Sequence, residues 1–233
     1  MSEHSWDTLL TESYTSLSSD YRQFLEENKK YFPSKAYYLN AFKTLARQDV
    51  KYILFGQDPY PRLESVSGYA FIDAKVKALF SPTGLSKEVN KASSLRNFIK
   101  MLLIARKDLI STNSSQEAIS HIDKSTLIDS IHDLRENFEK NGVLLLNTAL
   151  VFTDKQSSNS HTKEWRPFMR TLLKGLEKEN PKLILFGNHA KALKKHLPLT
   201  KFQTIELEHP YNHTFIENKR ALKLFEGMKL LDI

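Results

Sequence analysis

"KYILFGQDPYP", residues 51–61, joins a short apolar run to a turn that carries an amide, a carboxylate, a phenol and two prolines. Unbroken apolar runs of this length are typical of strands buried on both faces, as in a parallel sheet covered by helices. In open α/β sheets, ligands bind outside the carboxyl ends of such strands. We therefore expect a buried strand over residues 50–56 that presents the polar turn to a site.

The same apolar pattern returns further along the chain. The predicted strands cover residues 50–56, 142–150, 182–188 and 202–208. Amphipathic patterns predict helices over residues 36–47, 94–109 and 126–140, and over the series Trp165, Phe168, Met169, Leu172, Leu173 and Leu176. Strands that alternate with helices predict an α/β fold, here a three-layer α/β/α sandwich with a central four-stranded, mainly parallel sheet.

Local signals mark the ends of these elements. Thr126 and Asp129 are candidate caps for the helix over residues 126–140, which is expected to close at the following Asn-Gly pair. The polar stretches 111–125 and 153–164 are expected to be loops. Neither is long enough for a linker between domains, so residues 1–233 are expected to form a single domain.

Composition narrows the class of protein. The formal charge of +7 and the pI near 9.3 favour a polyanionic partner, although a solvated basic surface would look the same. The absence of cysteine excludes disulfides, thiolate zinc sites and cysteine nucleophiles. The N-terminus lacks a secretory pattern and no run is long and apolar enough to cross a membrane. We expect an intracellular protein, in the cytoplasm, or in the nucleus of a eukaryotic host, with no membrane partner.

Polar groups collect directly after the predicted strands, in "GQDPYP", "NTALVFTD", "GNHAKA" and "EHPYNHTF". Each piece also has a plainer explanation. "DPYP" is a good turn sequence, His209 could be a hydrogen-bonded core histidine, and Asn147 could cap a strand end. Taken singly, these pieces leave both interpretations open.

Taken together, the motifs resemble a known series. The series consists of "GQDPY" at 56–60, "SGYAF" at 67–71, "SSLRNF" at 93–98, "LLLNTAL" at 144–150, "SH" at 160–161 followed by Trp165 and Phe168, "LILFGNHA" at 183–190 and "HP" at 209–210. In this order they resemble the uracil-DNA glycosylases of the uracil-N-glycosylase type, of which the chain looks like a divergent member. The resemblance spans roughly residues 50–230.

The resemblance implies a catalytic pair. Asp58 stands at the family's catalytic aspartate, which positions a water and stabilises the cationic sugar that develops as the N-glycosidic bond breaks. His209 stands at the histidine that donates a hydrogen bond to uracil O2 as the base leaves as an anion, a task that a neutral imidazole can perform. Gln57 is implied to add contacts beside Asp58.

The resemblance also implies a pocket for the base. Asn147 would accept from N3–H of uracil and donate to O4, where cytosine presents the opposite pattern. Tyr60 would press on C5 and exclude the methyl group of thymine, and Phe71 would stack on the ring. Such a pocket is reached only by a base that is flipped out of the helix.

Further residues are implied to hold the DNA backbone. They are Ser94, Ser160, His161, Asn188, Tyr211 and His213. Hydroxyl and basic groups position phosphates without reading sequence, although ordinary loop polarity would also explain the serines.

The sequence departs from the family at four places. Pro61 replaces a histidine that helps to hold the aspartate and a phosphate, although poxviral members also carry proline there. "ASSLRN" replaces a proline-rich phosphate loop, and Asn188 stands where a Gly-Ser loop has serine. "HPYNHTF" lacks the leucine that fills the hole left by the flipped base, so Tyr211, His213 or Phe215 is the candidate wedge.

The implied activity is removal of uracil from DNA, single- or double-stranded, by a monomer without a cofactor or metal. His209 and His213 are four residues apart, but Pro210 and the lack of nearby acidic or cysteine ligands argue against a metal pair. No nucleotide-binding glycine-rich loop is visible either. The alternatives are a non-catalytic relative that binds DNA or a replication protein, and a glycosylase with another base preference. The resemblance further implies a small acidic inhibitor protein that imitates DNA.

Overall fold

The computed structural model describes residues 5–27 and 30–233, without the side chains of residues 189–191. The chain divides into two compact units. Unit 1 comprises Met1–Asp73 and Gly142–Glu206, and unit 2 comprises Ala74–Asn141 and Leu207–Ile233. The expectation that residues 1–233 act as one domain stays a prediction.

The central sheet has four strands, β1 (Tyr52–Gly56), β4 (Val143–Asn147), β5 (Lys182–Phe186) and β6 (Thr204–Leu207), in the order β4-β1-β5-β6. β1 runs parallel to both β4 and β5, and Gly56 lies opposite Asn147 in the register. All five residues of β4 are buried, as the unbroken apolar run predicts. The predicted α/β fold and the parallel sheet are confirmed, with each strand shorter than its predicted range.

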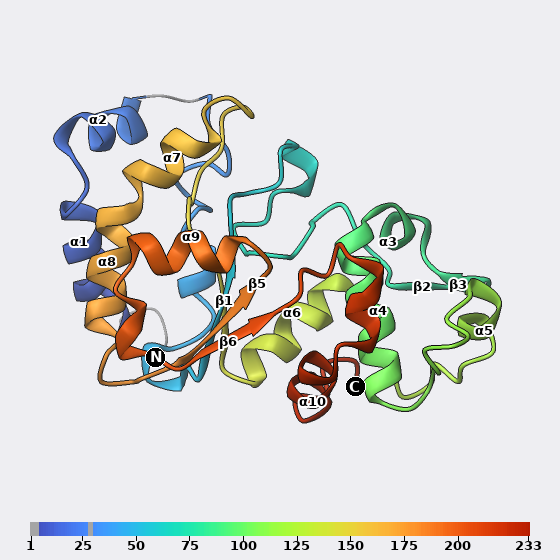
Figure 1. Cartoon of the computed structure of the whole chain (residues 1–233). Coiled ribbons are helices and arrows are strands. Elements are labelled where there is room, and N and C mark those ends of the chain that lie inside the picture. Colours follow the sequence, from blue (N-terminus) through green and yellow to red (C-terminus); the bar gives the residue numbers. More distant parts are fainter. Residues whose placement is uncertain (1–4, 28–29) are drawn as a thin grey trace. The chain divides into compact units, whose positions relative to one another are not determined.

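Unit 1 also holds the helices that pack near this sheet. These are α1 (Asp7–Thr15), α2 (Ser19–Glu27), α7 (Ser158–Glu164), α8 (Arg166–Gly175) and α9 (His189–His196), with short 3₁₀ turns at Asn40–Phe42, Arg47–Asp49, Leu63–Ser65 and Leu199–Lys201. α1 and α8 lie side by side (Figure 1). A Cβ at Gly175 would lie 2.3 Å from Leu9, so this glycine permits the close approach of the two helices. The apolar stripe from Trp165 to Leu176 is buried in the core.

Unit 2 is built mainly from helices. Its elements are the antiparallel pair β2 (Phe80–Ser81) and β3 (Gly84–Leu85), then α3 (Lys87–Lys91), α4 (Ser93–Ala105), α5 (Gln116–Ser120), α6 (Ile131–Lys140), the 3₁₀ helix η6 (His213–Glu217) and α10 (Lys219–Glu226). Phe98 on α4 contacts the rings of Phe138, Phe215 and Phe225, at 4.9 Å between centroids for Phe225. This aromatic cluster joins α4, α6, η6 and α10 into one core.

Two predictions of secondary structure were wrong: one segment expected to be a helix is not one, and one segment expected to be a loop contains a helix. Residues 36–47 form turns around the 3₁₀ helix Asn40–Phe42, and their buried Ala41, Phe42 and Leu45 pack without a regular helix. The polar segment 153–164, expected to be a loop, contains α7. Periodicity reports which side chains are buried, and irregular backbone can bury a similar set.

The predicted caps of the helix over residues 126–140 and the loop predicted over residues 111–125 were also wrong. Helix α6 begins at Ile131, with Ser130 as its cap in a capping box with Asp133, rather than at Thr126 or Asp129. The preceding backbone is instead tied to other parts of unit 2, because Leu127 bridges Asp232 and Ser130 bridges Ala78. The segment 111–125 contains the short helix α5. Within the described residues, no helix combines the length and apolar character needed to cross a bilayer.

Candidate active site

The turn after β1 is held by the end of β4. The backbone N–H of Thr148 donates to the carbonyl of Gly56 at 3.0 Å. The carbonyl of Gln57 then accepts from the Thr148 hydroxyl at 2.8 Å and from the Ala149 N–H at 3.0 Å. Because these bonds continue the parallel pairing beyond the strands, the turn that carries Gln57 and Asp58 rests on a rigid frame. The Gln57 side chain itself is exposed.

Asp58 is half-buried, and its carboxylate accepts a hydrogen bond from the hydroxyl of Ser158, the first residue of α7. A hydrogen bond to a charged acceptor is stronger than a neutral one, so it holds the carboxylate in one orientation. Ser158 was not among the residues predicted from the sequence. The only signal was its place in the polar stretch before "SH", where serines are unremarkable.

Asn147 ends β4, and its side chain lies against Gly56. Its exposed fraction is only 7%, and a Cβ at Gly56 would lie 2.2 Å from its Oδ1. No side chain fits there, so the glycine of "GQDPY" leaves the space that the amide occupies. The two residues are partners in the register of β1 and β4, which fixes the amide close to the turn that carries Asp58.

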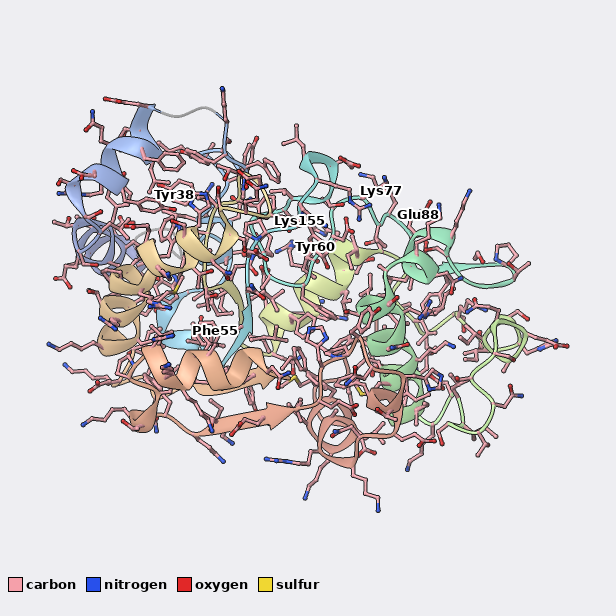
Figure 2. The ribbon with its side chains drawn as sticks, turned by 45° about the horizontal axis from the view of Figure 1, so that its top comes forward. Tyr38, Phe55, Tyr60, Lys77, Glu88 and Lys155 are labelled. Carbon is pink, nitrogen blue, oxygen red and sulfur yellow. The ribbon has the colours of Figure 1, made fainter. Side chains whose placement is uncertain are left out.

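Tyr60 and Phe71 are connected directly. The Tyr60 hydroxyl donates to the carbonyl of Phe71 at 3.3 Å, and burial, followed by the nearby charge of Asp73, raises the pKa of Tyr60. Figure 2 labels Phe55 on β1 and Tyr60 on the segment that follows it. Phe71 has a φ of +69°, which is rare for a bulky residue, and its ring lies 6.4 Å from that of Phe186. Backbone strain of this kind gathers at functional sites.

Unit 1 therefore gathers Gln57, Asp58, Tyr60, Phe71 and Asn147 around the carboxyl ends of β1 and β4. The arrangement offers a fixed carboxylate, a buried amide with one donor and one acceptor group, and two aromatic rings. These groups suit a small planar ligand with both hydrogen-bond donors and acceptors, attached to a centre that develops positive charge. The roles assigned to them stay predictions.

Three candidate DNA contacts also lie in unit 1. Ser160 on α7 and Asn188, which precedes α9, are exposed. His161 is 6% exposed, with Tyr21 Oη 2.7 Å from Nδ1 and Thr153 Oγ1 3.0 Å from Nε2. Burial lowers the pKa of His161, with Asp154 and other acids opposing the shift. Because both ring nitrogens have protein partners, this geometry favours a structural role for His161 over a phosphate contact.

His209 lies in unit 2, two residues after the end of β6. Its Nδ1 accepts a hydrogen bond from the backbone N–H of Tyr211 at 3.0 Å. In the neutral ring the proton must therefore sit on Nε2, which becomes the donor. Partial desolvation lowers the pKa of His209 and favours this neutral form. The tautomer is the one that the predicted role requires.

The loop after His209 is organised by two side chains within unit 2. Asn97 on α4 is 2% exposed, and its amide donates to the carbonyls of Pro210, Tyr211 and Asn212 at 2.8, 3.2 and 3.2 Å. Glu208 accepts from Asn212 at 3.0 Å and from the hydroxyl of Thr214. Asn97 lies in the quoted "SSLRNF" motif, but its role as an anchor was not predicted.

The remaining candidates of unit 2 lie at or near its surface. Tyr211 is 68% exposed and His213 is also exposed, whereas Phe215, the third candidate wedge, is fully buried. Its burial in the aromatic cluster rules out Phe215 as a wedge in this conformation, since a wedge must reach the DNA. Ser94 is half-buried in the first turn of α4.

One group of potential metal ligands exists among the described residues. It consists of His132, Asp133 and Glu136 on α6. Asp133 is already engaged by the capping box with Ser130, and His132 is exposed. None of the predicted site residues belongs to this group, and nothing else in the structure indicates an ion there.

Known proteins resemble this chain over most of its length. The family model described as the Uracil DNA glycosylase superfamily matches residues 42–226. A uracil-DNA glycosylase of Fusobacterium nucleatum is 32% identical over 190 residues, which cover 79% of this chain and 70% of that protein. A uracil-DNA glycosylase of Borreliella burgdorferi is 27% identical over 191 residues, covering 81% and 71%.

Solved structures extend the likeness to the fold. The crystal structure of the wild-type UNG from Nitratifractor salsuginis is 50% identical, with a TM-score of 0.96, and covers 98% of this chain and 92% of that one. The mimivirus uracil-DNA glycosylase, at 19% identity and a TM-score of 0.56 over 88% and 68%, shares the fold alone. With the family match over residues 42–226 and the relative at 32% identity, this chain belongs to the uracil-DNA glycosylase superfamily.

Proposed function

We propose that this protein is a uracil-DNA glycosylase, a DNA repair hydrolase that starts base excision at uracil. It breaks the bond between N1 of uracil and C1′ of deoxyribose, releases free uracil and leaves an abasic site. The observation that carries the proposal is the carboxylate of Asp58, held by Ser158 at the carboxyl end of β1 in a member of this family.

Asp58 acts on the sugar. As the N1–C1′ bond lengthens, both bonding electrons move to uracil and positive charge develops on the sugar. A fixed carboxylate stabilises this charge mainly in the transition state, which is where an interaction raises the rate. Asp58 also orients the water whose oxygen bonds to C1′. That water supplies the hydroxyl group to the sugar and, overall, a proton to uracil.

His209 acts on the departing base. The Nε2–H of its neutral ring donates to O2 of uracil, where negative charge builds up. The hydrogen bond from the Tyr211 N–H to Nδ1 supports this tautomer. A neutral donor suffices because the charge on O2 strengthens the bond as the reaction proceeds.

Base choice rests on Asn147, Tyr60 and Phe71. Asn147 accepts from N3–H and donates to O4, Tyr60 leaves no room for a methyl group at C5, and Phe71 stacks on the ring. The burial of Asn147 supports this role, since a buried amide left unpaired by cytosine costs about 1–3 kcal/mol.

The substrate is DNA whose uracil is flipped out of the stack, which costs a few kcal/mol that phosphate contacts offset. Ser94, Ser160 and Asn188 are the proposed phosphate contacts, and the exposed Tyr211 or His213 is the proposed wedge. The enzyme is proposed to act as a monomer without cofactor. A mimivirus UNG variant has been solved in complex with UGI, which supports the proposal of a DNA-mimicking inhibitor protein.

The test is a single-stranded oligonucleotide with one uracil, incubated with excess enzyme and treated with alkali. Wild type should yield a strand break at uracil, and Asp58→Asn and His209→Leu should each lose most of this activity. Asp20→Asn is the matched control, because it removes an exposed carboxylate of α2. If wild type leaves the uracil intact while still binding the strand, the protein is instead the non-catalytic relative.

A further inference from the structure

A cavity of about 430 Å³ lies in unit 1 among the ends of β1, β4 and β5 and the helices α7, α8 and α9. We call it the α8–α9 cavity. Its volume falls in the range of pockets that hold small organic molecules, roughly 300–1,000 Å³. None of the residues proposed above to bind uracil directly, Tyr60, Phe71 and Asn147, lines it.

One side of the cavity adjoins the turn that carries Asp58. Gln57 and Asn159 are part of its wall, and they are the sequence neighbours of Asp58 and Ser158, which are hydrogen-bonded to each other. Consecutive Cα atoms lie only about 3.8 Å apart. The backbone of Asp58 and that of Ser158 therefore lie beside the cavity wall.

The charge of the cavity is one-sided. Lys163, Arg166 and His196 line it, and no aspartate or glutamate of the described chain does. The side chains of Lys163 and Arg166 have no ion pair or hydrogen bond within residues 5–27, 30–188 and 192–233. Desolvation, followed by the positive charges of Arg166, Lys195 and Arg170, lowers the pKa of His196. The field at this place favours an anion.

The floor of the cavity is apolar. Met169, Leu193 and Leu197 line it and are 1%, 4% and 7% exposed. A lone inorganic anion would gain nothing from this floor. A ligand that combines an anionic group with a flat, weakly polar ring would contact both parts, and a nucleotide has this composition.

We propose that the α8–α9 cavity is a subsite for one nucleotide of the DNA strand that flanks the uracil. Its phosphate lies against Lys163 and Arg166 and its base lies over Met169, Leu193 and Leu197. Exposed amides at the wall, Gln57 and Asn188, hydrogen-bond to the sugar-phosphate or the base edge. This inference rests on the proposed function and adds a second point at which the enzyme holds its substrate strand.

The test combines shortened substrates with a charge-removing variant. Single-stranded oligonucleotides carry uracil with two nucleotides on each side, and are then shortened by one nucleotide at a time from either end. The variant is Lys163→Gln with Arg166→Gln. The control is Lys174→Gln, an exposed cation on the same helix α8 that does not line the cavity.

For wild type and the control, removing the nucleotide that occupies the cavity should lower kcat/KM about tenfold, mainly through KM. On the full substrate, the double variant should have the kcat/KM that wild type has on the shortened substrate. Shortening the substrate should lower the kcat/KM of the double variant by less than about twofold. The slope of log K against log salt should become shallower by about one phosphate contact, because the two side chains hold a single phosphate. If shortening costs wild type and double variant the same factor, or neither end matters, the subsite is refuted.

A second measurement follows the Met169 methyl signal by NMR in Asp58→Asn, with an oligonucleotide that contains no uracil. The signal should move, and should stay in place when Lys163 and Arg166 are also replaced. If free deoxycytidine monophosphate or inorganic phosphate moves it equally while shortening has no kinetic effect, a strand nucleotide is ruled out. Should no substrate be cleaved at all, the proposed function fails, whereas the Met169 signal still decides the subsite.

Discussion

Ser158 supplies a hydrogen bond to Asp58 that the side chain of Pro61 cannot donate. The family histidine after "GQDPY" helps to hold the aspartate, and proline has no side-chain donor. The hydroxyl of Ser158 supplies a hydrogen bond to the Asp58 carboxylate from another element, α7. Loss of one donor at Pro61 therefore does not leave Asp58 without support.

Replacing Ser158 by alanine should lower kcat by roughly tenfold to a hundredfold, because a hydrogen bond to a charged group contributes about 1.5–3 kcal/mol. KM should change little, since the strand contacts are intact. Ser158→Thr keeps the hydroxyl and should restore most of the rate. Steady-state kinetics on a uracil oligonucleotide measure both. An alanine variant with wild-type kcat, or a threonine variant as slow as alanine, would contradict the positioning role.

His209 gives a prediction about pH. Its pKa is lowered by desolvation, and protonation of Nδ1 would remove the bond from the Tyr211 N–H. The neutral ring therefore persists to lower pH than in a free histidine, whose pKa is about 6.5. NMR titration should give a midpoint below about 6.5 and a proton on Nε2 at neutral pH. A midpoint at or above that value, or a proton on Nδ1, would overturn the assignment of the donor.

The strands could be predicted from sequence because their apolar runs are unbroken, as in β4, where burial on both faces leaves one interpretation. That the polar residues directly after these strands lie close together could also be predicted, because the carboxyl ends of parallel strands meet at one edge of the sheet. The helix α7 could not be predicted, because "SNSHTKE" has no apolar stripe and only its last two residues, Lys163 and Glu164, are strong helix formers. It owes its place to tertiary contacts, above all the buried His161.

Contacts between α2 and α7 give a prediction about stability. His161 is buried with Tyr21 on α2 and Thr153 at its ring nitrogens, and desolvation lowers its pKa. The unfolded chain takes up a proton near pH 6.5, whereas the folded chain does so only at lower pH. Stability should therefore be complete above about pH 6.5 and fall as pH drops below it, by at most about 1.4 kcal/mol per pH unit for this group.

Urea unfolding of wild type and His161→Gln between pH 5 and 7.5 measures this effect. The other histidines are common to both proteins, so the difference in slope isolates His161. The variant should be less stable at pH 7.5 by about 1–3 kcal/mol and should lose less stability on acidification. Identical pH slopes would show that His161 has the same pKa in both states.

The molecule as a whole carries 34 lysines and arginines against 27 acidic residues. Sequence alone could not tell whether this excess is used for phosphates or only solvates the surface. The α8–α9 cavity is lined by Lys163 and Arg166 and by no described acid. It therefore favours the interpretation that part of the excess positive charge binds phosphate. For the wedge, the sequence left three candidates, Tyr211, His213 and Phe215. The structure removes Phe215, because its side chain is buried.

If the charge of +7 serves phosphates, affinity for DNA must depend steeply on salt. Asp58→Asn allows this measurement with uracil-containing single strands, because binding is then observed without cleavage. For three to five neutralised phosphates, log K should fall against log salt with a slope of about −2 to −3.5. The same slope should appear with a uracil-free strand, while the affinity itself is lower by the contribution of the base. A slope near zero would mean that the excess charge is spread over surfaces that the DNA does not touch.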